Sequence, residues 1–296
     1  MTLFKEKTSG HIEEINNYLE SWLPDSQIPP KNLHQAMNYS VMNGGKRIRP
    51  LLTFAAAETL NIDHKILTPA AASIELLHSF SLVHDDLPCM DDDDLRRGRP
   101  ATHKAFDEAT AVLAADALLS LAFEILGSDL SFNGSKEINA SLVSLIANAT
   151  GSKGITGGQA LDLNAESLIL DQAELEHIYR QKTGKLLRAC VLSPCCFINL
   201  GLEKTTALER YVDAIGLAFQ IKDDIIEAEG KTEDIGKSSH SDIDQAKATF
   251  PKIFGLNHSK KRVNDLLHNA KDALSVFGKD AEPLISMAEI IVSRKL

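Results

Sequence analysis

The sequence predicts an all-α fold, a single-domain bundle of ten or more helices spanning residues 1–296. Apolar residues recur at three- and four-residue spacing, as in Leu76, Phe80, Val83 and Leu87, which places them on one face of a helix. No segment shows convincing strand alternation, and aromatic strand formers make up only 5% of the chain. No Pro- or Ser-rich linker divides the sequence, so we expect one domain.

The helices are expected to lie between breaks that contain glycine or proline. These breaks fall at residues 24–30, 44–45, 98–100, 127–134, 151–158 and 230–241. The most apolar segment, 111–126, is interrupted by Asp116 and Glu124. It therefore predicts a helix in a core or subunit interface, and we expect no membrane span.

Composition excludes several classes of function. The net charge of -10 argues against nucleic acid as a partner, because backbone binding needs an excess of Lys and Arg. The N-terminal residues mix charged and apolar side chains, unlike a signal peptide. The four cysteines form no CxxC pair, so we expect free thiols in a reducing cytoplasm rather than a zinc site.

The first acidic cluster is HDDLPCMDDDDLRRGRPATH, residues 84–103, with six aspartates within ten positions. Pro88 should disturb the helix that carries Asp85 and Asp86, because proline lacks a backbone donor and clashes one turn back. The chain can then bend so that Asp91 returns toward Asp85. In an unbroken helix these two aspartates would lie on different faces.

The second acidic cluster is FQIKDDIIEAEG, residues 219–230, where Asp223 and Glu227 share a helical face beside Asp224. Two carboxylates about 4 Å apart repel by roughly 4 kcal/mol at an effective dielectric of 20. Oxygen ligands without nearby His or Cys favour Mg²⁺, which completes its shell with phosphate oxygens. The pair of clusters therefore predicts a magnesium site that binds a phosphorylated substrate.

Each of these charged motifs, taken alone, can also be interpreted as solvent-exposed surface without a ligand. A single acidic run is typical of a solvated surface. The segment GGKRIRP, residues 44–50, lacks P-loop spacing and by itself resembles a helix-start loop with solvated cations. Two acidic clusters beside apolar helical faces, followed by Arg96, Arg97 and Lys237, favour diphosphate binding instead, because arginine can donate two parallel hydrogen bonds to phosphate.

Taken in order, the motifs GGKRIRP, HDDLPCMDDDDLRRGRPATH, GGQALDL, KTGKLL, FQIKDDIIEAEG and DIGKS resemble the short-chain trans-prenyltransferases. The resemblance runs from about Leu33 to the C-terminus. Four residues separate the first aspartate pair from Asp91, as in the bacterial farnesyl diphosphate synthases of this family. The resemblance implies an isoprenoid synthase fold around a central cavity, isopentenyl and allylic diphosphates as substrates, a homodimer, and three Mg²⁺ ions.

The resemblance also implies roles for individual residues. Asp85, Asp91 and Asp223 would bind the metal ions, and Asp86, Asp162, Asp224 and Glu227 would orient metal-bound water or basic side chains. Arg96, Lys182, Lys237 and, more weakly, Lys247 would bind the allylic diphosphate, whereas Lys46, Arg49, His78 and Arg97 would bind isopentenyl diphosphate. Thr183 and Gln220 would place oxygen dipoles beside the developing allylic cation, and Phe80 would limit product length. Helical spacing adds Ser81 as a second candidate for product length, because it lies four residues before Asp85 on nearly the same face.

Three residues depart from the motifs of the family. Glu227 stands where the family usually has Asp, Lys222 precedes Asp223, and Ala115 replaces a frequent Gly.

The sequence leaves several alternative functions open. The product could be geranylgeranyl or geranyl diphosphate instead of farnesyl diphosphate. A non-catalytic regulatory subunit is disfavoured because the aspartates and the RRG sequence are present. A terpene cyclase is disfavoured by the second aspartate pair, and an EF-hand protein by the absence of its loop spacing.

Overall fold

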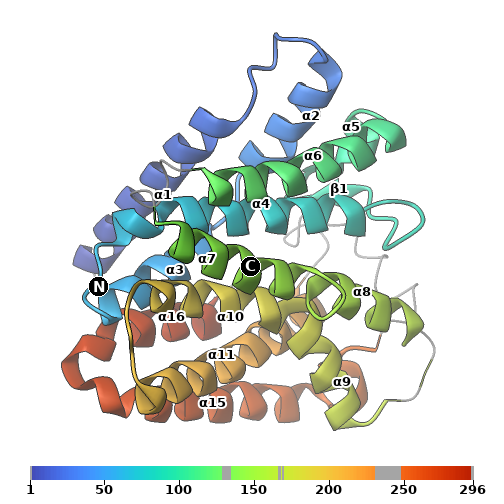
Figure 1. Ribbon diagram of the computed structural model, residues 1–296. Helices are drawn as coiled ribbons and strands as arrows, with labels where there is room; N and C mark the ends of the chain where they lie inside the picture. The colour runs from blue at the N-terminus through green and yellow to red at the C-terminus, as the bar shows by residue number, and fades with distance from the viewer. Residues whose placement is uncertain (1, 129–134, 166–167, 169, 231–247, 295–296) are drawn as a thin grey trace.

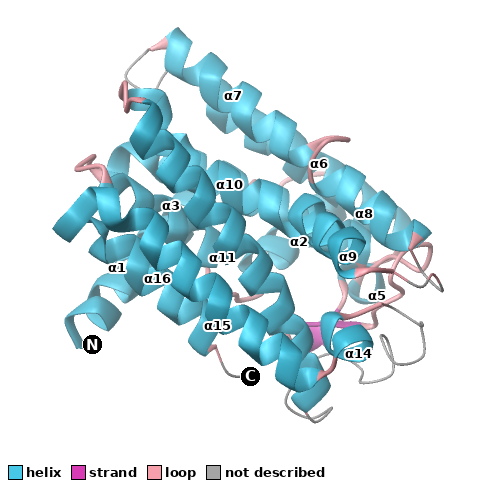
Figure 2. Cartoon of the chain, turned by 90° about the horizontal axis from the view of Figure 1, so that it is seen from below, coloured by secondary structure: helices cyan, strands magenta, loops and turns pink. Residues whose placement is uncertain are grey.

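The computed structural model describes residues 2–128, 135–165, 168, 170–230 and 248–294, and these form a helical bundle (Figures 1 and 2). The N-terminal part contains α1 (Thr2–Trp22), α2 (Lys31–Met42), α3 (Ile48–Thr59), η1 (His64–Leu67), α4 (Thr68–Asp85), α5 (Thr102–Ala105) and α6 (Glu108–Gly127). The rest contains α7 (Lys136–Thr150), α8 (Ile155–Asn164), α9 (Gln172–Tyr179), η2 (Arg180–Gly184), α10 (Lys185–Leu192), η3 (Ser193–Phe197), α11 (Leu202–Glu229), α14 (Phe250–Phe254), α15 (Leu256–Ala273), η4 (Leu274–Ala281) and α16 (Glu282–Ser293). The predicted all-α fold with ten or more helices is confirmed.

The strands found in the described part of the chain are very short. Strands β1 (Leu95–Arg96) and β2 (Arg99–Pro100) pair antiparallel. The two residues between them, Arg97 and Gly98, have φ of 55° and 75°. Positive φ at both central positions is the geometry of a type I′ hairpin turn. This hairpin fixes the direction of the two arginines that follow the first acidic cluster.

Two helix pairs pack against each other over most of their length. Helix α4 packs along α6, and α11 packs along α15. Nearly every side chain of α4 before His84 is buried, including Ala70, Ile74 and Leu77. Burial on all sides explains why α4 is apolar around its whole circumference rather than on one stripe. The acidic motifs therefore occupy the ends of two rigid, well-packed helices.

Two helices, 64–85 and 108–127, are long and apolar enough to cross a membrane by length and composition alone. In the most apolar window of the first helix, 78% of the residues are buried inside the bundle. The corresponding value for α6 is 44%, and Val112 and Leu113 lie exposed on its surface. The first helix is a core element, whereas one face of α6 is not covered by the described residues.

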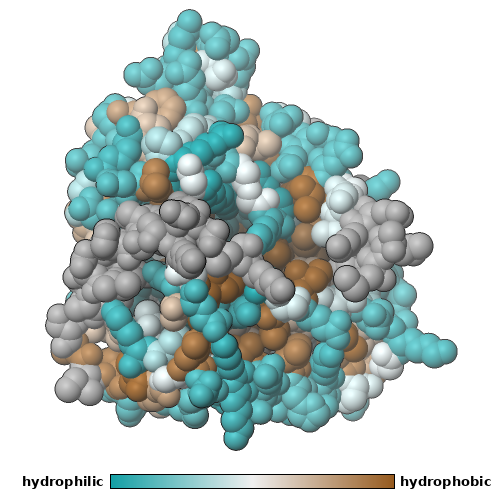
Figure 3. All heavy atoms as spheres, turned by 180° about the vertical axis from the view of Figure 1, so that it is seen from behind, coloured by the Kyte–Doolittle hydropathy of each residue, from teal (hydrophilic) through white to brown (hydrophobic). Residues whose placement is uncertain are grey.

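Exposed apolar residues elsewhere are scattered. On the face seen in Figure 3, apolar residues lie in small groups among hydrophilic ones. The large exposed apolar residues in the described segments come from different elements, except for the adjacent pair Val112 and Leu113. Isolated exposed apolar side chains are ordinary for a folded protein.

Candidate active site

The first acidic motif begins where α4 ends. The helix stops at Asp85, and the backbone N–H of Asp86 still donates to Leu82 O at 3.1 Å. The chain then folds back after Pro88, because the Asp91 N–H donates to the Asp85 carbonyl at 2.8 Å. The predicted bend is confirmed, and it brings the backbone of Asp91 against that of Asp85.

The carboxyl group of Asp85 lies in an environment that disfavours its charge. Burial raises its pKa to about 6, Lys182 acts in the opposite direction, and Asp91 raises the pKa further. A carboxyl group in this position gains most from a nearby cation. Oxygen donors from Asp85 and Asp91 are the type that Mg²⁺ prefers, so these residues fit the predicted metal.

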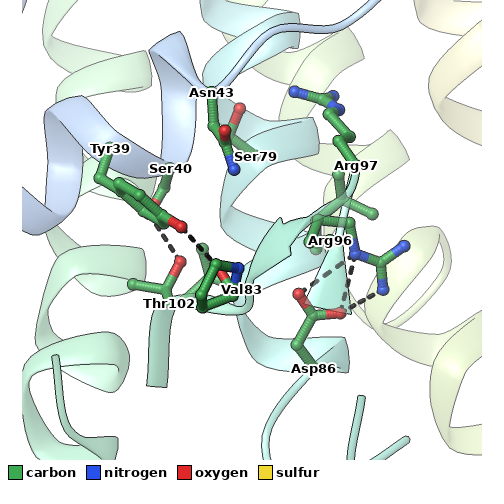
Figure 4. Close-up of a pocket in the computed structure, with 11 residues that line it drawn as sticks. Tyr39, Ser40, Asn43, Ser79, Val83, Asp86, Arg96, Arg97 and Thr102 are labelled. Atoms are coloured by element: carbon green, nitrogen blue, oxygen red, sulfur yellow. Dashed lines mark hydrogen bonds and ion pairs between the residues drawn. The ribbon is translucent and has the colours of Figure 1, made fainter. Parts of the chain in front are cut away.

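Arg96 is held in place by the acidic cluster itself. Its Nε donates to Asp86 at 2.9 Å, and a terminal guanidinium nitrogen also contacts Asp86 (Figure 4). The same nitrogen donates to Asp93 Oδ2 at 3.1 Å. Asp86 and Asp93 are buried, so these ion pairs are shielded from water. Asp86 thus orients a basic side chain, in the arrangement that the resemblance implied.

The cations of the GGKRIRP segment have separate surroundings. Arg47 is buried and pairs with Glu75 at 3.0 Å, and its Nε donates to Asn16 at 2.9 Å. Its guanidinium therefore joins α1 to α4. Arg49 is also buried but lies over the Phe219 ring, 5.9 Å from the centroid. Lys46 is exposed.

The hairpin brings Arg97 to the same region. Its guanidinium donates to Gly44 O at 2.5 Å. Gly45 has φ of 123°, which favours glycine, and a Cβ there would lie 2.8 Å from the Arg97 guanidinium carbon, so the arginine side chain would have to shift. Burial lowers the pKa of His78 well below its usual value, and the nearby arginines, Arg49 and Arg97 foremost, lower it further. The structure thus gathers Arg49, His78 and Arg97, with a neutral imidazole among the cations.

A small cavity lies beside these arginines, lined by Tyr39, Asn43, Asp86, Arg96 and Arg97 among others (Figure 4). Its volume of about 20 Å³ is enough for a single water molecule. This space is therefore too small for a diphosphate group.

The η2 segment is a π-helical turn, a wider turn that is frequent at functional sites. Lys182 in this turn pairs with Asp162 of α8 at 2.6 Å. Desolvation lowers the pKa of Lys182, but Asp162, Asp85 and Asp91 outweigh it and raise that pKa overall. The ammonium group therefore stays charged and lies within electrostatic reach of the first acidic motif.

The next residue connects to the second acidic motif. Thr183 Oγ1 donates to Gln220 Oε1 at 2.8 Å, and Gln220 Nε2 donates to Asp224 Oδ1 at 3.2 Å. Asp224 also accepts from the Tyr179 hydroxyl and from the Phe250 backbone N–H at 3.0 Å. Asp224 is therefore buried in a hydrogen-bonded position, whereas its neighbour Asp223 remains 43% exposed.

Asp223 faces a residue that sequence reasoning missed. Arg294, just beyond α16, pairs with Asp223 at 3.1 Å and donates to Phe219 O at 3.1 Å. Its guanidinium carbon lies 3.8 Å from the centroid of the Phe219 ring. A lone arginine near the C-terminus carries no spacing signal, so nothing in the sequence indicated this contact.

Two further contacts of the site were also missed. Gln159 Nε2 lies 3.4 Å from Asp91 Oδ1, and Tyr179 contacts Asp224 as described above. Gln159 lies within the motif GGQALDL, and Tyr179 lies three positions before the motif KTGKLL. Lys237 and Lys247 lie outside the described residues.

The two residues assigned to product length are both buried on α4. The Phe80 ring packs edge-on against His84, with ring centroids 4.8 Å apart. Ser81 Oγ donates to His78 O at 2.9 Å within the same helix. Their effect on product length stays a prediction.

Comparison with known proteins gives a consistent result. The family model for polyprenyl synthetase matches residues 30–280. The chain is 42% identical to a farnesyl diphosphate synthase from Haemophilus influenzae, with 99% of each chain covered. It is similar to the crystal structure of an FPP/GFPP synthase from Zymomonas mobilis, with a TM-score of 0.87 and 36% identity over 99% of both chains.

A geranyltransferase from Helicobacter pylori, solved with magnesium and isoprenyl diphosphate, gives a TM-score of 0.82 and 31% identity. The alignment covers 97% of this chain and 95% of that one. The family match and the full-length relatives agree with the motifs and with the helical fold. The chain belongs to the polyprenyl synthetase family.

Proposed function

We propose that this protein is a Mg²⁺-dependent prenyltransferase that condenses isopentenyl diphosphate with dimethylallyl diphosphate and then geranyl diphosphate, giving farnesyl diphosphate. The observation that carries the proposal is the position of the η2 turn. Lys182 lies within electrostatic reach of Asp85 and Asp91, while Thr183 is hydrogen-bonded toward Asp224 through Gln220. One short segment thus connects both acidic motifs.

This arrangement suits cleavage of an allylic carbon–oxygen bond. Negative charge develops on the diphosphate that leaves, and Arg96 and Lys182 supply fixed positive charge there. Bound Mg²⁺ would supply Lewis-acid stabilisation of the same charge. Asp85, Asp91 and Asp223 would hold the ions, for which we propose three per active site, with a diphosphate completing their coordination.

The remaining polar groups of the site contact the allylic cation and isopentenyl diphosphate. Thr183 and Gln220 present a hydroxyl and an amide oxygen, whose dipoles stabilise the allylic cation without bonding to it. Arg49, His78 and Arg97, with Lys46 at the exposed edge, bind the diphosphate of isopentenyl diphosphate. Its double bond attacks the cation, and a proton then leaves the new chain. The departing diphosphate is the base that we propose for this proton.

The farnesyl product is favoured over the alternatives by the relatives and by Phe80. The relative from Haemophilus influenzae is a farnesyl diphosphate synthase. Phe80 is a bulky buried ring one helical turn before His84, near the end of the helix that carries Asp85. A ring there would block growth beyond fifteen carbons. A geranylgeranyl or geranyl diphosphate synthase is the alternative.

We also propose a cytoplasmic homodimer that uses the exposed face of α6. Val112 and Leu113 are 38% and 58% exposed, although α6 is the most apolar long helix of the described chain. Burial of this face against a second copy would remove apolar surface from water. Size-exclusion chromatography with light scattering tests the dimer, and Leu113→Glu should shift it toward monomer.

The deciding experiment is incubation of the purified protein with isopentenyl and dimethylallyl diphosphates and Mg²⁺, followed by chain-length analysis of the dephosphorylated products. A fifteen-carbon product is expected, and chelation of Mg²⁺ should abolish it. A twenty- or ten-carbon product would support one of the alternatives. A folded protein that makes no product would point to the non-catalytic subunit.

Matched variants separate the metal ligands from ordinary surface carboxylates. Asp85→Asn, Asp91→Asn and Asp223→Asn should each lower kcat by roughly 100-fold or more. Asp213→Asn is the control, because Asp213 lies on the same helix as Asp223 but pairs with Arg188 at 3.2 Å. If Asp213→Asn lowers kcat as much as the other changes, the assignment of metal ligands is wrong.

The two diphosphate sites can be separated kinetically. Arg49→Ala and His78→Ala should raise the KM of isopentenyl diphosphate more than that of the allylic substrate. Arg96→Ala and Lys182→Ala should act mainly on the allylic substrate or on kcat. Equal effects of all four changes on both substrates would contradict this division.

A further inference from the structure

A second cluster of metal-binding side chains lies at the opposite end of α4 from the acidic motif. It consists of His11 and Glu14 on α1, Glu58 on α3 and His64 on η1, and we call it the N-terminal cluster. Helix α1 packs against α3 and α4 on this side of the bundle (Figure 1). At about 1.5 Å rise per residue, the length of α4 separates this cluster from Asp85 by roughly 25 Å. It is therefore distinct from the prenyltransferase site.

The geometry suits one metal ion. One ligand atom each from His11, Glu58 and His64 can be chosen so that all three lie within 4.8 Å of one another. His11 Nε2 is 3.7 Å from Glu58 Oε1. Ligands at about 2.0–2.2 Å from a tetrahedral Zn²⁺ lie roughly 3.3 Å from each other. Side-chain movements of about 1 Å would close the cluster around an ion, and all three side chains are only partly buried.

Neighbouring groups already orient the ligands. The Phe54 ring packs edge-on against both imidazoles, with centroids 5.2 Å from each. Glu14 lies 3.0 Å from His64 Nε2, and its other oxygen accepts from Thr68 Oγ1 at 2.9 Å. A carboxylate that holds a histidine in this way is typical of the shell around a protein-bound zinc ion.

The donor types select the metal. Two imidazoles and one carboxylate suit Zn²⁺ and related divalent transition ions, whereas Mg²⁺ prefers oxygen donors and dehydrates reluctantly. Three protein ligands leave one tetrahedral position for water. The N-terminal cluster and the aspartate motifs should therefore take different metals from the same solution.

We propose that His11, Glu58 and His64 bind one Zn²⁺-type ion, with Glu14 orienting His64, and that this ion fastens α1 to α3 and η1. These three segments are different parts of the sequence, so an ion bound to all three crosslinks them. An ion bound only by the folded chain stabilises it by mass action. Zn²⁺ at about 100 times its Kd should raise the unfolding temperature by roughly 5 °C.

The test titrates the full-length protein with Zn²⁺, and separately with Co²⁺, in excess Mg²⁺ so that the aspartate motifs are occupied. One equivalent of Zn²⁺ should bind, and Co²⁺ should give a tetrahedral visible spectrum without thiolate charge-transfer absorption. His11→Gln, His64→Gln and Glu58→Gln should each weaken Zn²⁺ binding at least tenfold and remove the Zn²⁺-dependent rise in Tm. Prenyltransferase activity with Mg²⁺ should be unchanged in all three variants.

The control is His268→Gln, because His268 is exposed on α15, pairs with Asp272 at 3.2 Å and is not one of the cluster residues. It should bind Zn²⁺ like the parent protein. Equal Zn²⁺ affinity in the parent and in His11→Gln or His64→Gln would overturn the proposal, as would a thiolate band in the Co²⁺ spectrum. The Co²⁺ spectrum needs no variant, so an octahedral spectrum or a thiolate band overturns the proposal even if a substitution prevents folding.

Discussion

Gly158 lies where α8 contacts the η2 turn, and its replacement by alanine tests whether this contact positions the site. A Cβ at Gly158 would lie 2.2 Å from the backbone nitrogen of Lys182 and 2.6 Å from the Gln181 carbonyl carbon. Normal contacts between such atoms are about 3.5–4.0 Å. The turn must therefore move by roughly 1 to 2 Å, because backbone atoms cannot rotate away as a flexible side chain can.

Two opposing effects set the stability change in Gly158→Ala. Overpacking of this kind costs about 1–3 kcal/mol, and a clash with backbone belongs at the upper end. Alanine in a helix recovers about 1 kcal/mol relative to glycine. The net loss should be about 2 kcal/mol, which for a chain of this size lowers Tm by roughly 4 °C.

The effect on catalysis should be larger than the effect on stability. Movement of η2 would break two contacts. Lys182 Nζ lies 2.6 Å from Asp162 Oδ2, and Thr183 Oγ1 lies 2.8 Å from Gln220 Oε1. A displacement of about 1 Å at a reacting centre can lower the rate about 100-fold. We expect such a loss in kcat/KM for the allylic substrate, measured by steady-state kinetics below the Tm of the variant.

Gly10→Ala is the matched control, because a Cβ at Gly10 on α1 would meet no atom within 4 Å. It should keep full activity and gain a little stability. If Gly158→Ala has the Tm and kcat/KM of the parent protein, the contact between α8 and η2 does not position the site. A lower Tm with unchanged kcat/KM would show that the contact serves folding alone.

Three further predictions follow from single contacts. Phe80→Ala should shift the product toward twenty carbons or more, and a folded variant that still stops at fifteen carbons shows that this ring is not the barrier. Arg294→Gln removes a cation paired with Asp223, so half-maximal activity should need about two- to fivefold less Mg²⁺, and an unchanged requirement would contradict this. Burial raises the pKa of Cys190 to about 12, so at pH 8 only about one thiol in 10⁴ is ionised. Iodoacetamide should modify exposed Cys89 in the folded protein and Cys190 only after unfolding, and rapid labelling of Cys190 in the folded state would refute its burial.

The local features of the site could be predicted from the sequence. The spacing of apolar residues predicted the helices. The position of Pro88 predicted the bend that returns Asp91 to Asp85. These features depend on backbone geometry over a few residues, which local sequence specifies. The chemistry of paired carboxylates likewise indicated a metal and a phosphorylated substrate before any helix was placed.

Other features depend on which helix faces meet, and only the tertiary structure decided them. Arg47 and Arg49 stand two positions apart in one motif, yet Arg47 is buried against Glu75 while Arg49 lies over the Phe219 ring. The pairing of Arg294 with Asp223 joins two helix ends that are distant in sequence. Such contacts arise from packing across the bundle, and spacing along the chain contains no information about them.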